Sequence, residues 1–374
     1  MSIPKVLHVS SARLAVGGVE RFLLGFCENL RQEYKFALLS GADESFQSRL
    51  GQAGCFPFAW NVKSPLDLQA AEQVGAAMAL YQPAIVHLHD ARAALIVRLL
   101  SRQRGAKIVY TVHLPPYSYR WKRFTALRRF IYAQVERFLN RSFTDAIVYP
   151  SISGWQEALH RQYSPSHKAF CIPNGIDLTP FASPSFERRS VNEVPIVCTV
   201  ARLSEEKNVG LVLEAASLLV KQGLRFVLWI VGDGPQRKEL EMKAERLGLA
   251  SYTRFWGAQA DVLPFLQKAD IFVLASWYEG GRSYSVMEAQ AAGLGCVLSN
   301  VADHAEMAAE GCGRVFPPGD VSACAEQLGW LIAHPQERGE MGRAGRAKAF
   351  REYSLQTMVG QYRNLYRSLL EEGV

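Results

Sequence analysis

The sequence lacks a long apolar run, a paired-cysteine motif and any internal repeat. None of its apolar stretches reaches the roughly 18 residues that a membrane-spanning helix needs, so no such helix is predicted. Its seven cysteines are scattered without a CxxC pair, which favours reduced thiols in a cytoplasmic protein over a disulfide framework or a zinc site. No repeat of 20–50 residues and no low-complexity segment occurs, and 49% apolar with 21% charged residues is the composition of a soluble globular protein rather than a disordered or fibrous one.

Positive charge is unevenly distributed along the chain. Residues 1–182 contain 21 Lys and Arg against 12 Asp and Glu, a net charge of +9, whereas residues 183–374 contain 21 against 23, a net charge of −2. The first half is therefore expected to meet an anionic partner. An anion site in the second half must depend on individual side chains, because bulk charge does not supply it.

Short apolar runs alternate with amphipathic helical patterns in both halves. We expect strands at residues 3–9, 36–40, 85–88, 107–112 and 146–149, and again at 196–200, 226–231, 253–256, 271–274 and 296–298. This alternation predicts the α/β class, with parallel sheets covered by helices on both faces.

A segment rich in Pro, Ser and charge at residues 180–195 predicts a linker between two domains. We expect an N-terminal domain at 1–182 and a C-terminal domain at 183–353, both Rossmann-like, doubly wound and facing a cleft. A C-terminal helix at 354–374 is expected to return to the first domain.

Two cations follow the first strand of the second half. Arg202 and Lys207 lie in the segment ARLSEEKNV, between a predicted strand and a predicted helix. Arginine offers a planar fork of donors and lysine a point charge, so the pair suits a diphosphate; an ordinary solvated loop is the alternative. Downstream, Gly232 and Gly234 in VGDGP indicate a tight turn, with Pro235 at the first helical position, rather than a dinucleotide fingerprint.

A Gly-rich loop flanked by two carboxylates follows a later strand. Glu279 precedes the loop, and Glu288 lies in a helix that we expect to begin near Ser285. Backbone N–H groups from Gly281 through Ser283 to Ser285, together with the helix dipole, attract phosphate. Because carboxylates accept hydrogen bonds from sugar and ribose hydroxyls, the combination suits a nucleotide sugar. The alternative for Glu279 is a capping or surface acid.

Six motifs that follow one another along the chain resemble those of one family. They are PNGID at 173–177, ARLxxxK at 201–207, VGDGP at 231–235, FWG at 255–257, ADIFVLAS at 269–276, and EG followed by MEAxAAG at 287–293. In this order they resemble the retaining GT-B glycosyltransferases of family four, the group 1 glycosyl transferases. GGVER at 17–21 and a histidine at a strand end fit the same pattern.

The resemblance implies that the domain at 1–182 binds the acceptor, that the domain at 183–353 binds the nucleotide-sugar donor, and that both contribute residues to the site. The catalytic residues would be Arg202, Lys207, Glu279 and His113, and the donor-binding residues Gly17, Gly18, Gly257, Gly281, Ser283 and Glu288. The two cations would hold the donor diphosphate, while Glu288 would bind the ribose hydroxyls and Glu279 the sugar. Two other histidines, His87 and His89, are interpreted as ordinary core residues.

The family pattern also implies the substrates. The donor would be a nucleotide-diphosphate sugar, a UDP-sugar ahead of a GDP-sugar, and the acceptor a glycan or lipid-linked glycan in cell-surface polysaccharide or lipopolysaccharide biosynthesis. No Asp-x-Asp motif occurs, so we expect a metal-independent hexosyltransferase without a cofactor, in which side-chain cations replace a divalent ion.

One departure from the pattern concerns the two glutamates. Eight residues separate Glu279 from Glu288, where the family usually has seven, so either the loop bulges or Glu279 is displaced from the sugar. The altered spacing leaves open a non-catalytic nucleotide-sugar binding protein, and a nucleotide-sugar epimerase or hydrolase on the same fold is a further alternative.

Basic and aromatic side chains are combined in residues 117–141. The segment holds seven Arg or Lys against Glu136 alone, a net charge of +6, with apolar residues interleaved at helical spacing. It is either a domain helix with a solvated basic face or a face for anionic lipid or a lipid-diphosphate acceptor; nucleic acid fits the fold less well. We predict the lipid face, and with it peripheral association with the inner face of the cytoplasmic membrane. The predicted face comprises Arg120, Trp121, Lys122, Arg123, Arg128 and Arg129.

Overall fold

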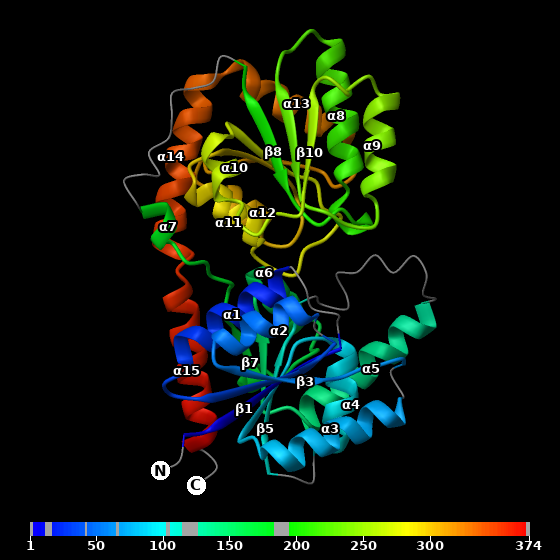
Figure 1. Cartoon of the computed structure of the whole chain (residues 1–374), viewed down its shortest axis with the longest axis vertical. Coiled ribbons are helices and arrows are strands. Elements are labelled where there is room, and N and C mark those ends of the chain that lie inside the picture. Colours follow the sequence, from blue (N-terminus) through cyan, green and yellow to red (C-terminus); the bar gives the residue numbers. More distant parts are fainter. Residues whose placement is uncertain are drawn as a thin grey trace. The chain divides into compact units, whose positions relative to one another are not determined.

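Two units make up the computed structural model, which describes residues 3–11, 17–41, 43–64, 67–101, 105–113, 126–182 and 194–371 (Figure 1). Unit 1 comprises Met1–Asn174 and Leu355–Val374, and unit 2 comprises Gly175–Ser354. The predicted linker therefore begins inside unit 2, and its residues 183–193 lie outside the described part of the chain.

Unit 1 is built on a seven-stranded sheet in the order β3-β2-β1-β4-β5-β6-β7, and its pairings are parallel. Its strands are β1 (Lys5–Ser10), β2 (Lys35–Ser40), β3 (Cys55–Ala59), β4 (Ile85–Leu88), β5 (Lys107–Thr111), β6 (Ala146–Tyr149) and β7 (Ala169–Cys171). Its helices are α1 (Gly18–Leu30), α2 (Glu44–Gln52), α3 (Leu68–Tyr81), α4 (Ala91–Ser101), α5 (Ala126–Ser142), α6 (Ile152–His160) and α15 (Leu355–Glu371).

The C-terminal helix α15 packs on unit 1, as predicted. Leu7 and Val9 of β1 belong to an apolar core shared with α3 and α4, so His8 between them faces the other side of the sheet. On that side the ring of Phe26 in α1 meets the ring of Tyr362 in α15 edge-on, with centroids 5.2 Å apart. Contacts of this kind close the second face of the sheet with α1 and α15.

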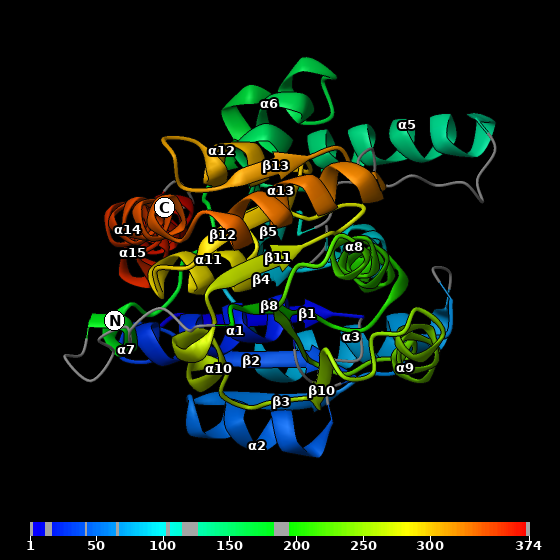
Figure 2. The same cartoon turned by 90° about the horizontal axis from the view of Figure 1, so that it is seen from above.

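Unit 2 is built on a six-stranded parallel sheet in the order β10-β9-β8-β11-β12-β13. Its strands are β8 (Ile196–Val200), β9 (Val227–Val231), β10 (Thr253–Gly257), β11 (Ile271–Leu274), β12 (Gly295–Ser299) and β13 (Arg314–Phe316). Its helices are α7 (Thr179–Ala182), α8 (Val209–Lys221), α9 (Arg237–Arg246), α10 (Leu263–Lys268), α11 (Tyr284–Ala291), α12 (His304–Ala308), α13 (Val321–Ala333) and α14 (Pro335–Glu352). Separate apolar clusters line its two faces, one with α8 and α13 and the other with α10 and α11. Figure 2 shows α8 and α9 on one side of these strands and α10 and α11 on the other.

The two sheets share a doubly wound strand order, which confirms the predicted α/β class with two Rossmann-like domains. In each sheet the first strand is internal, the second and third lie on one side of it, and the fourth and later strands lie on the other. The winding direction reverses between β1 and β4 in unit 1 and between β8 and β11 in unit 2. Open α/β sheets bind ligands outside the carboxyl ends of the strands at such a switch point. Of the helices in the described part of the chain, none combines the length and apolarity needed to cross a membrane.

Candidate functional site

The loops after β8 and β11 meet at the switch point of unit 2. Lys207 ends a short 3-10 turn after β8, and Glu279 lies in the loop after β11. Nζ of Lys207 donates a hydrogen bond to Oε1 of Glu279 at 2.6 Å. The same two loops are joined by a backbone hydrogen bond, in which the Trp277 N–H donates to the carbonyl oxygen of Glu206 at 2.8 Å. The structure thus brings two of the predicted catalytic residues into direct contact.

The Glu279 carboxylate is anchored through one oxygen. The hydroxyl of Ser276 donates to Oε1, the same atom that accepts from Lys207, at 2.6 Å. No hydrogen bond to Oε2 occurs among the described residues. Burial would raise the pKa of Glu279, whose side chain is only 10% exposed, but the Lys207 charge and the hydrogen bonds outweigh burial and lower this pKa below its usual value. Glu279 is therefore an ionised carboxylate with one oxygen left to accept a hydrogen bond.

Arg202 comes from the same loop as Lys207 but does not join the Lys207–Glu279 pair. Its guanidinium forms an ion pair with Glu206, and its Nε donates to Oγ of Ser204 at 3.3 Å. The Arg202 side chain is 63% exposed, so the guanidinium remains open to solvent. Of the two cations predicted to act together, only Lys207 contacts the buried carboxylate.

Three glycines form close backbone contacts beside the loop that carries Arg202 and Lys207. Gly232 has a φ of +133°, and a Cβ at that position would lie 1.9 Å from the carbonyl oxygen of Ala201. A Cβ on Gly234 would lie 2.4 Å from the carbonyl oxygen of Leu203. The N–H of Gly232 donates to the carbonyl oxygen of Gly257 at 2.8 Å. Only glycine permits such close backbone contacts at positions 232 and 234. VGDGP is therefore a tight turn, as predicted, and it packs against the backbone of the segment that carries Arg202.

The prediction that Pro235 opens a helix was wrong by two residues. Helix α9 begins at Arg237, and Pro235 and Gln236 form a turn ahead of it. The N–H of Gln236 donates to the carbonyl oxygen of Leu203 at 3.0 Å, which holds the turn against the neighbouring loop. A tertiary hydrogen bond therefore takes the place of the first helical turn.

Glu288 lies on the partly exposed stripe of α11. Its neighbours Met287 and Ala289 are fully buried, whereas Tyr284 and Ser285 are partly exposed like Glu288 itself. Residues three and four positions apart share a helix face, so these three side chains lie together. The eight residues between the two glutamates divide into four loop residues, 280–283, and four helical residues, 284–287.

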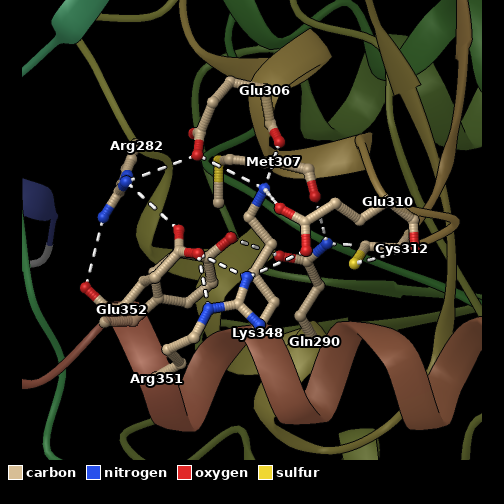
Figure 3. Close-up of polar contacts among 10 residues, drawn as sticks. Arg282, Gln290, Glu306, Met307, Glu310, Cys312, Lys348, Arg351 and Glu352 are labelled. Atoms are coloured by element: carbon tan, nitrogen blue, oxygen red, sulfur yellow. Dashed lines mark hydrogen bonds and ion pairs between the residues drawn. The ribbon is translucent and has the colours of Figure 1, made fainter.

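An ion-pair network fixes the loop between Glu279 and Glu288 (Figure 3). Arg282, only 7% exposed, pairs with Glu306 at 3.4 Å and with Glu352 at 3.5 Å. Lys348 of α14 is 2% exposed and pairs with the same Glu306 at 3.3 Å. Arg282 therefore anchors the loop to α12 and to the end of α14, and its charge is compensated within the protein.

The Ser283 hydroxyl is bound to a histidine that sequence reasoning missed. Oγ of Ser283 lies 2.8 Å from Nε2 of His304, and Nδ1 of His304 lies 2.9 Å from the carbonyl oxygen of Ser299. Burial lowers the pKa of His304, so its ring is neutral near pH 7. Because Nδ1 must donate to the carbonyl, Nε2 accepts from Ser283. The Ser283 hydroxyl is thus already hydrogen-bonded to His304, so the predicted phosphate contact of Ser283 would come from its backbone N–H.

Unit 1 carries the remaining predicted residues. Gly17 immediately precedes α1, which begins at Gly18, and residues 12–16 ahead of them lie outside the described part of the chain. His113 follows β5, with Nε2 lying 3.1 Å from Nδ1 of His89. Burial lowers the pKa of His113 to about 4, against a raising effect of Asp90. His113 is therefore neutral near pH 7.

Helix α5 exposes an apolar stripe and buries a mixed apolar and polar face. Its exposed fractions range from 40% to 66% at the apolar positions Leu127, Phe130, Ile131, Val135 and Phe138. These positions follow helical spacing and form one stripe. On the opposite face Glu136, 7% exposed, pairs at 2.9 Å with the fully buried Arg98 of α4. The helix thus buries this ion pair together with Leu139 and leaves a separate apolar stripe exposed.

The basic part of the predicted lipid face falls mainly outside what the structure describes. Arg120, Trp121, Lys122 and Arg123 precede the described start of α5, and only the backbone of Arg128 and Arg129 is described. In both views the beginning of α5 extends outward from the rest of unit 1 (Figures 1 and 2).

Family models match both halves of the chain. Residues 16–180 match Glycosyltransferase Family 4, and residues 184–348 match Glycosyl transferases group 1. The two doubly wound α/β domains are those of the GT-B glycosyltransferase fold. The chain belongs to this class as a member of family four, the group 1 glycosyltransferases.

Individual relatives agree with this family. The chain is 28% identical over 229 residues, 58% of each protein, to the UDP-Gal:alpha-D-GlcNAc-diphosphoundecaprenol alpha-1,3-galactosyltransferase of Escherichia coli. It is 25% identical to the sulfoquinovosyl transferase SQD2 of Arabidopsis thaliana over 86% of this chain and 64% of that protein. The solved structure of Alr3699/HepE from Anabaena, in complex with UDP and glucose, superposes with a TM-score of 0.83 at 20% identity, covering 98% of this chain and 100% of that one. Across the first three curated relatives that it matches, the chain spans 35%, 82% and 58% of their lengths.

Proposed function

We propose that the protein is a retaining glycosyltransferase that transfers a sugar from a nucleotide-diphosphate sugar to a glycan or lipid-linked glycan acceptor. Its place would be cell-surface polysaccharide or lipopolysaccharide biosynthesis. The observation that carries this proposal is the Lys207–Glu279 pair at the switch point of unit 2. A UDP-sugar is proposed ahead of a GDP-sugar, a choice supported by the UDP in the HepE structure and by the UDP-Gal in the name of the Escherichia coli relative.

Lys207 and Glu279 divide the work on the donor. The Lys207 ammonium has three N–H donors and gives one to Glu279, so two are left for diphosphate oxygens. As the bond from the anomeric carbon to the diphosphate breaks, negative charge grows on the leaving group, and a fixed cation stabilises that state most. Oε2 of Glu279 accepts a hydrogen bond from a hydroxyl of the donor sugar. The acceptor oxygen bonds to the anomeric carbon on the face that the diphosphate leaves, and the acceptor hydroxyl proton passes to the departing diphosphate oxygen. Arg202 adds a second, solvent-exposed cation to the departing diphosphate.

The other predicted residues complete the donor site. Glu288 binds the ribose hydroxyls, and the backbone near Gly257 contacts the base. The backbone amides of Gly281 and Ser283, at the start of α11, receive the diphosphate. In unit 1, the glycines Gly17 and Gly18 approach the phosphate, and His113 contacts the sugar. No step in this scheme uses a metal ion.

A panel of nucleotide sugars tests the proposal and separates its alternatives. Nucleotide release should depend on an acceptor, persist in excess chelator, and yield a product with the anomeric configuration of the donor. Release without any acceptor would indicate a hydrolase, and binding without turnover would indicate a binding protein. The Lys243→Ala variant is the matched control, because it removes an ion pair of the same 2.6 Å length, with Glu214 between α8 and α9, that involves neither Lys207 nor Glu279.

We further propose that α5 docks the protein on an anionic membrane. The exposed apolar stripe of α5 suits the interfacial region of a bilayer, and the basic residues before and within the helix suit its anionic headgroups. A soluble protein domain is a poorer occupant, because residues 117–141, the part of the sequence that contains the stripe, have a net charge of +6. Each Lys or Arg that reaches such a surface contributes about 1 kcal/mol, which permits reversible binding.

Vesicle flotation tests the docking proposal. The protein should float with anionic vesicles at low salt and less at high salt, since the Debye length falls from about 10 Å at 0.1 M to about 3 Å at 1 M. Replacing Arg120, Lys122, Arg123, Arg128 and Arg129 with Gln should abolish flotation, and Phe130→Ser with Phe138→Ser should weaken it; a matched control replaces Lys238 and Arg246 of α9 with Gln. Equal recovery on neutral vesicles, or flotation unchanged by these substitutions, would exclude this surface.

A further inference from the structure

A chain of three hydrogen-bonded imidazoles crosses the switch point of unit 1. His8 on β1, His89 after β4 and His113 after β5 come from three adjacent strands. Nδ1 of His8 lies 2.9 Å from Nε2 of His89, and Nδ1 of His89 lies 3.1 Å from Nε2 of His113. The chain therefore runs from the fully buried His8 to the partly exposed His113.

All three rings are neutral near pH 7. Burial lowers the pKa of His8 to about 3 and that of His113 to about 4. The pKa of His89 is also lowered, by burial first and then by the neighbouring histidines. A neutral imidazole has one donor nitrogen and one acceptor nitrogen, and each hydrogen bond needs one of each. The tautomers of the three rings are consequently coupled, so fixing one end of the chain fixes them all.

His8 sets the direction of the chain. Its Nε2 is buried without a hydrogen-bond partner among the described residues. The rings of Phe26 and Phe36 lie 5.5 Å and 5.6 Å from the His8 ring, centroid to centroid, and aromatic faces accept hydrogen bonds only weakly. A buried N–H without an acceptor is rarer in proteins than an acceptor without a donor. The His8 proton therefore resides on Nδ1 and is donated to His89.

We propose that His8 and His89 are positioning residues that fix His113 as its Nδ1–H tautomer. His89 accepts at Nε2 and so donates from Nδ1 to Nε2 of His113, which leaves the His113 proton on Nδ1. That nitrogen has no hydrogen-bond partner in the part of the chain that the structure describes. His113 can thus donate a hydrogen bond to a ligand oxygen but cannot remove a proton from it. That the ligand is the donor sugar rests on the proposed function; the tautomer does not.

Nitrogen NMR of histidine-labelled full-length protein tests the tautomer without any ligand. Protonated and unprotonated ring nitrogens have well separated shifts, and His113→Asn identifies the His113 signals. We expect Nδ1 of His113 to be protonated and Nε2 to be unprotonated at pH 7. The reverse pattern would overturn the proposal. Because no substrate is present, a failure to turn over any nucleotide sugar would count against the proposed function and leave this assignment standing.

Two substitutions of His8 test whether the chain of imidazoles sets the tautomer of His113. His8→Leu deletes the donor, so His113 should populate both tautomers and kcat/KM should fall about tenfold, the effect of one lost hydrogen bond. His8→Asn places an amide donor near the former Nδ1 and should restore the single tautomer and most of the activity.

The matched control is His87→Gln in the same buried layer. Both nitrogens of His87 are bonded elsewhere, to Tyr366 at 2.6 Å and to Thr111 at 2.7 Å. His87→Gln should lower stability and leave the His113 shifts unchanged. The proposal would be contradicted by a folded His8→Leu variant in which the His113 nitrogen shifts are those of the wild type. It would also be contradicted by a His87→Gln variant in which those shifts change.

Discussion

The two switch points share a strand order and differ in the chemistry placed on it. In unit 2, Lys207 and Glu279 face each other as ions across the switch, and the lowered pKa of Glu279 keeps the carboxylate charged. In unit 1, His8, His89 and His113 cross the corresponding switch as neutral rings, because burial lowers their pKa values. One topology therefore supports a charged site and a neutral one. Under the proposed function, the charged pair would meet the departing diphosphate and the neutral His113 would meet the sugar.

The first prediction removes the charge from unit 2. Lys207→Ala should lower kcat/KM by about 100-fold, since it deletes the cation that stabilises the leaving diphosphate and leaves Glu279 as an uncompensated charge. Lys243→Ala, which breaks an ion pair of the same length elsewhere in unit 2, should leave turnover near wild type. Steady-state kinetics on folded variants gives the comparison. Equal activity in the two variants would mean that the switch-point pair is structural.

The second prediction separates the two glutamates. Glu288→Ala should raise the KM for the donor about tenfold through loss of the ribose contact, and it should raise this KM more than Glu279→Ala does. Glu279→Ala should act mainly on kcat, because its carboxylate is placed by Lys207 and Ser276 beside the leaving group. Kinetics with the donor varied at saturating acceptor measures both effects. A larger rise in donor KM for Glu279→Ala would reverse the two assignments.

The third prediction concerns pH. Activity requires ionised Glu279, whose pKa is lowered, so the wild-type rate should fall only once the pH drops through that lowered value. Lys207→Met removes the attraction and leaves burial, which raises the pKa, so the acid limb should move to higher pH. The residual activity of the variant, measured across the acid range, tests this sign. An acid limb that stays in place or moves to lower pH would show that Glu279 does not govern it.

The smallest expected effect belongs to Ser276. Ser276→Ala removes one hydrogen bond to Oε1 of Glu279 and retains the bond from Lys207, so kcat/KM should fall only about fivefold. Ser217→Ala on α8 is a suitable control because its hydroxyl bonds a backbone carbonyl away from the switch point, that of Leu247. A loss as large as that of Lys207→Ala would mean that Ser276 does more than orient the carboxylate.

Most strands were predictable from the sequence, and three strands at sheet edges were not. The central strands are buried on both faces and appear as short apolar runs, whereas β3 contains a proline and β7 and β13 have only three residues each. Each missed strand pairs on one side only in its sheet. Their formation depends on the neighbouring strand more than on their own composition.

The site was predictable where residues lie near strand ends and hidden where a contact spans the fold. Lys207 and Glu279 each follow a strand, so the parallel topology alone places them at one edge of a sheet. The hydrogen bond between them joins residues 72 positions apart, and the Ser283–His304 bond joins residues 21 positions apart. In the imidazole chain the His8–His89 step spans 81 positions and the His89–His113 step spans 24. No local pattern encodes these pairings. His87 behaves as predicted for a core histidine, while His89 proves to be the middle member of a chain.

Hydrogen exchange of the full-length protein with and without UDP tests most directly that unit 2 holds the donor at its charged switch point. UDP should slow amide exchange in the loop at residues 201–208 and in the loop and helix start at 276–285, with little change along α9. Those segments carry Lys207, Glu279 and the start of α11, and bound phosphate would cover their N–H groups. UDP binding that leaves both segments unprotected would contradict the account, however active the enzyme proved to be.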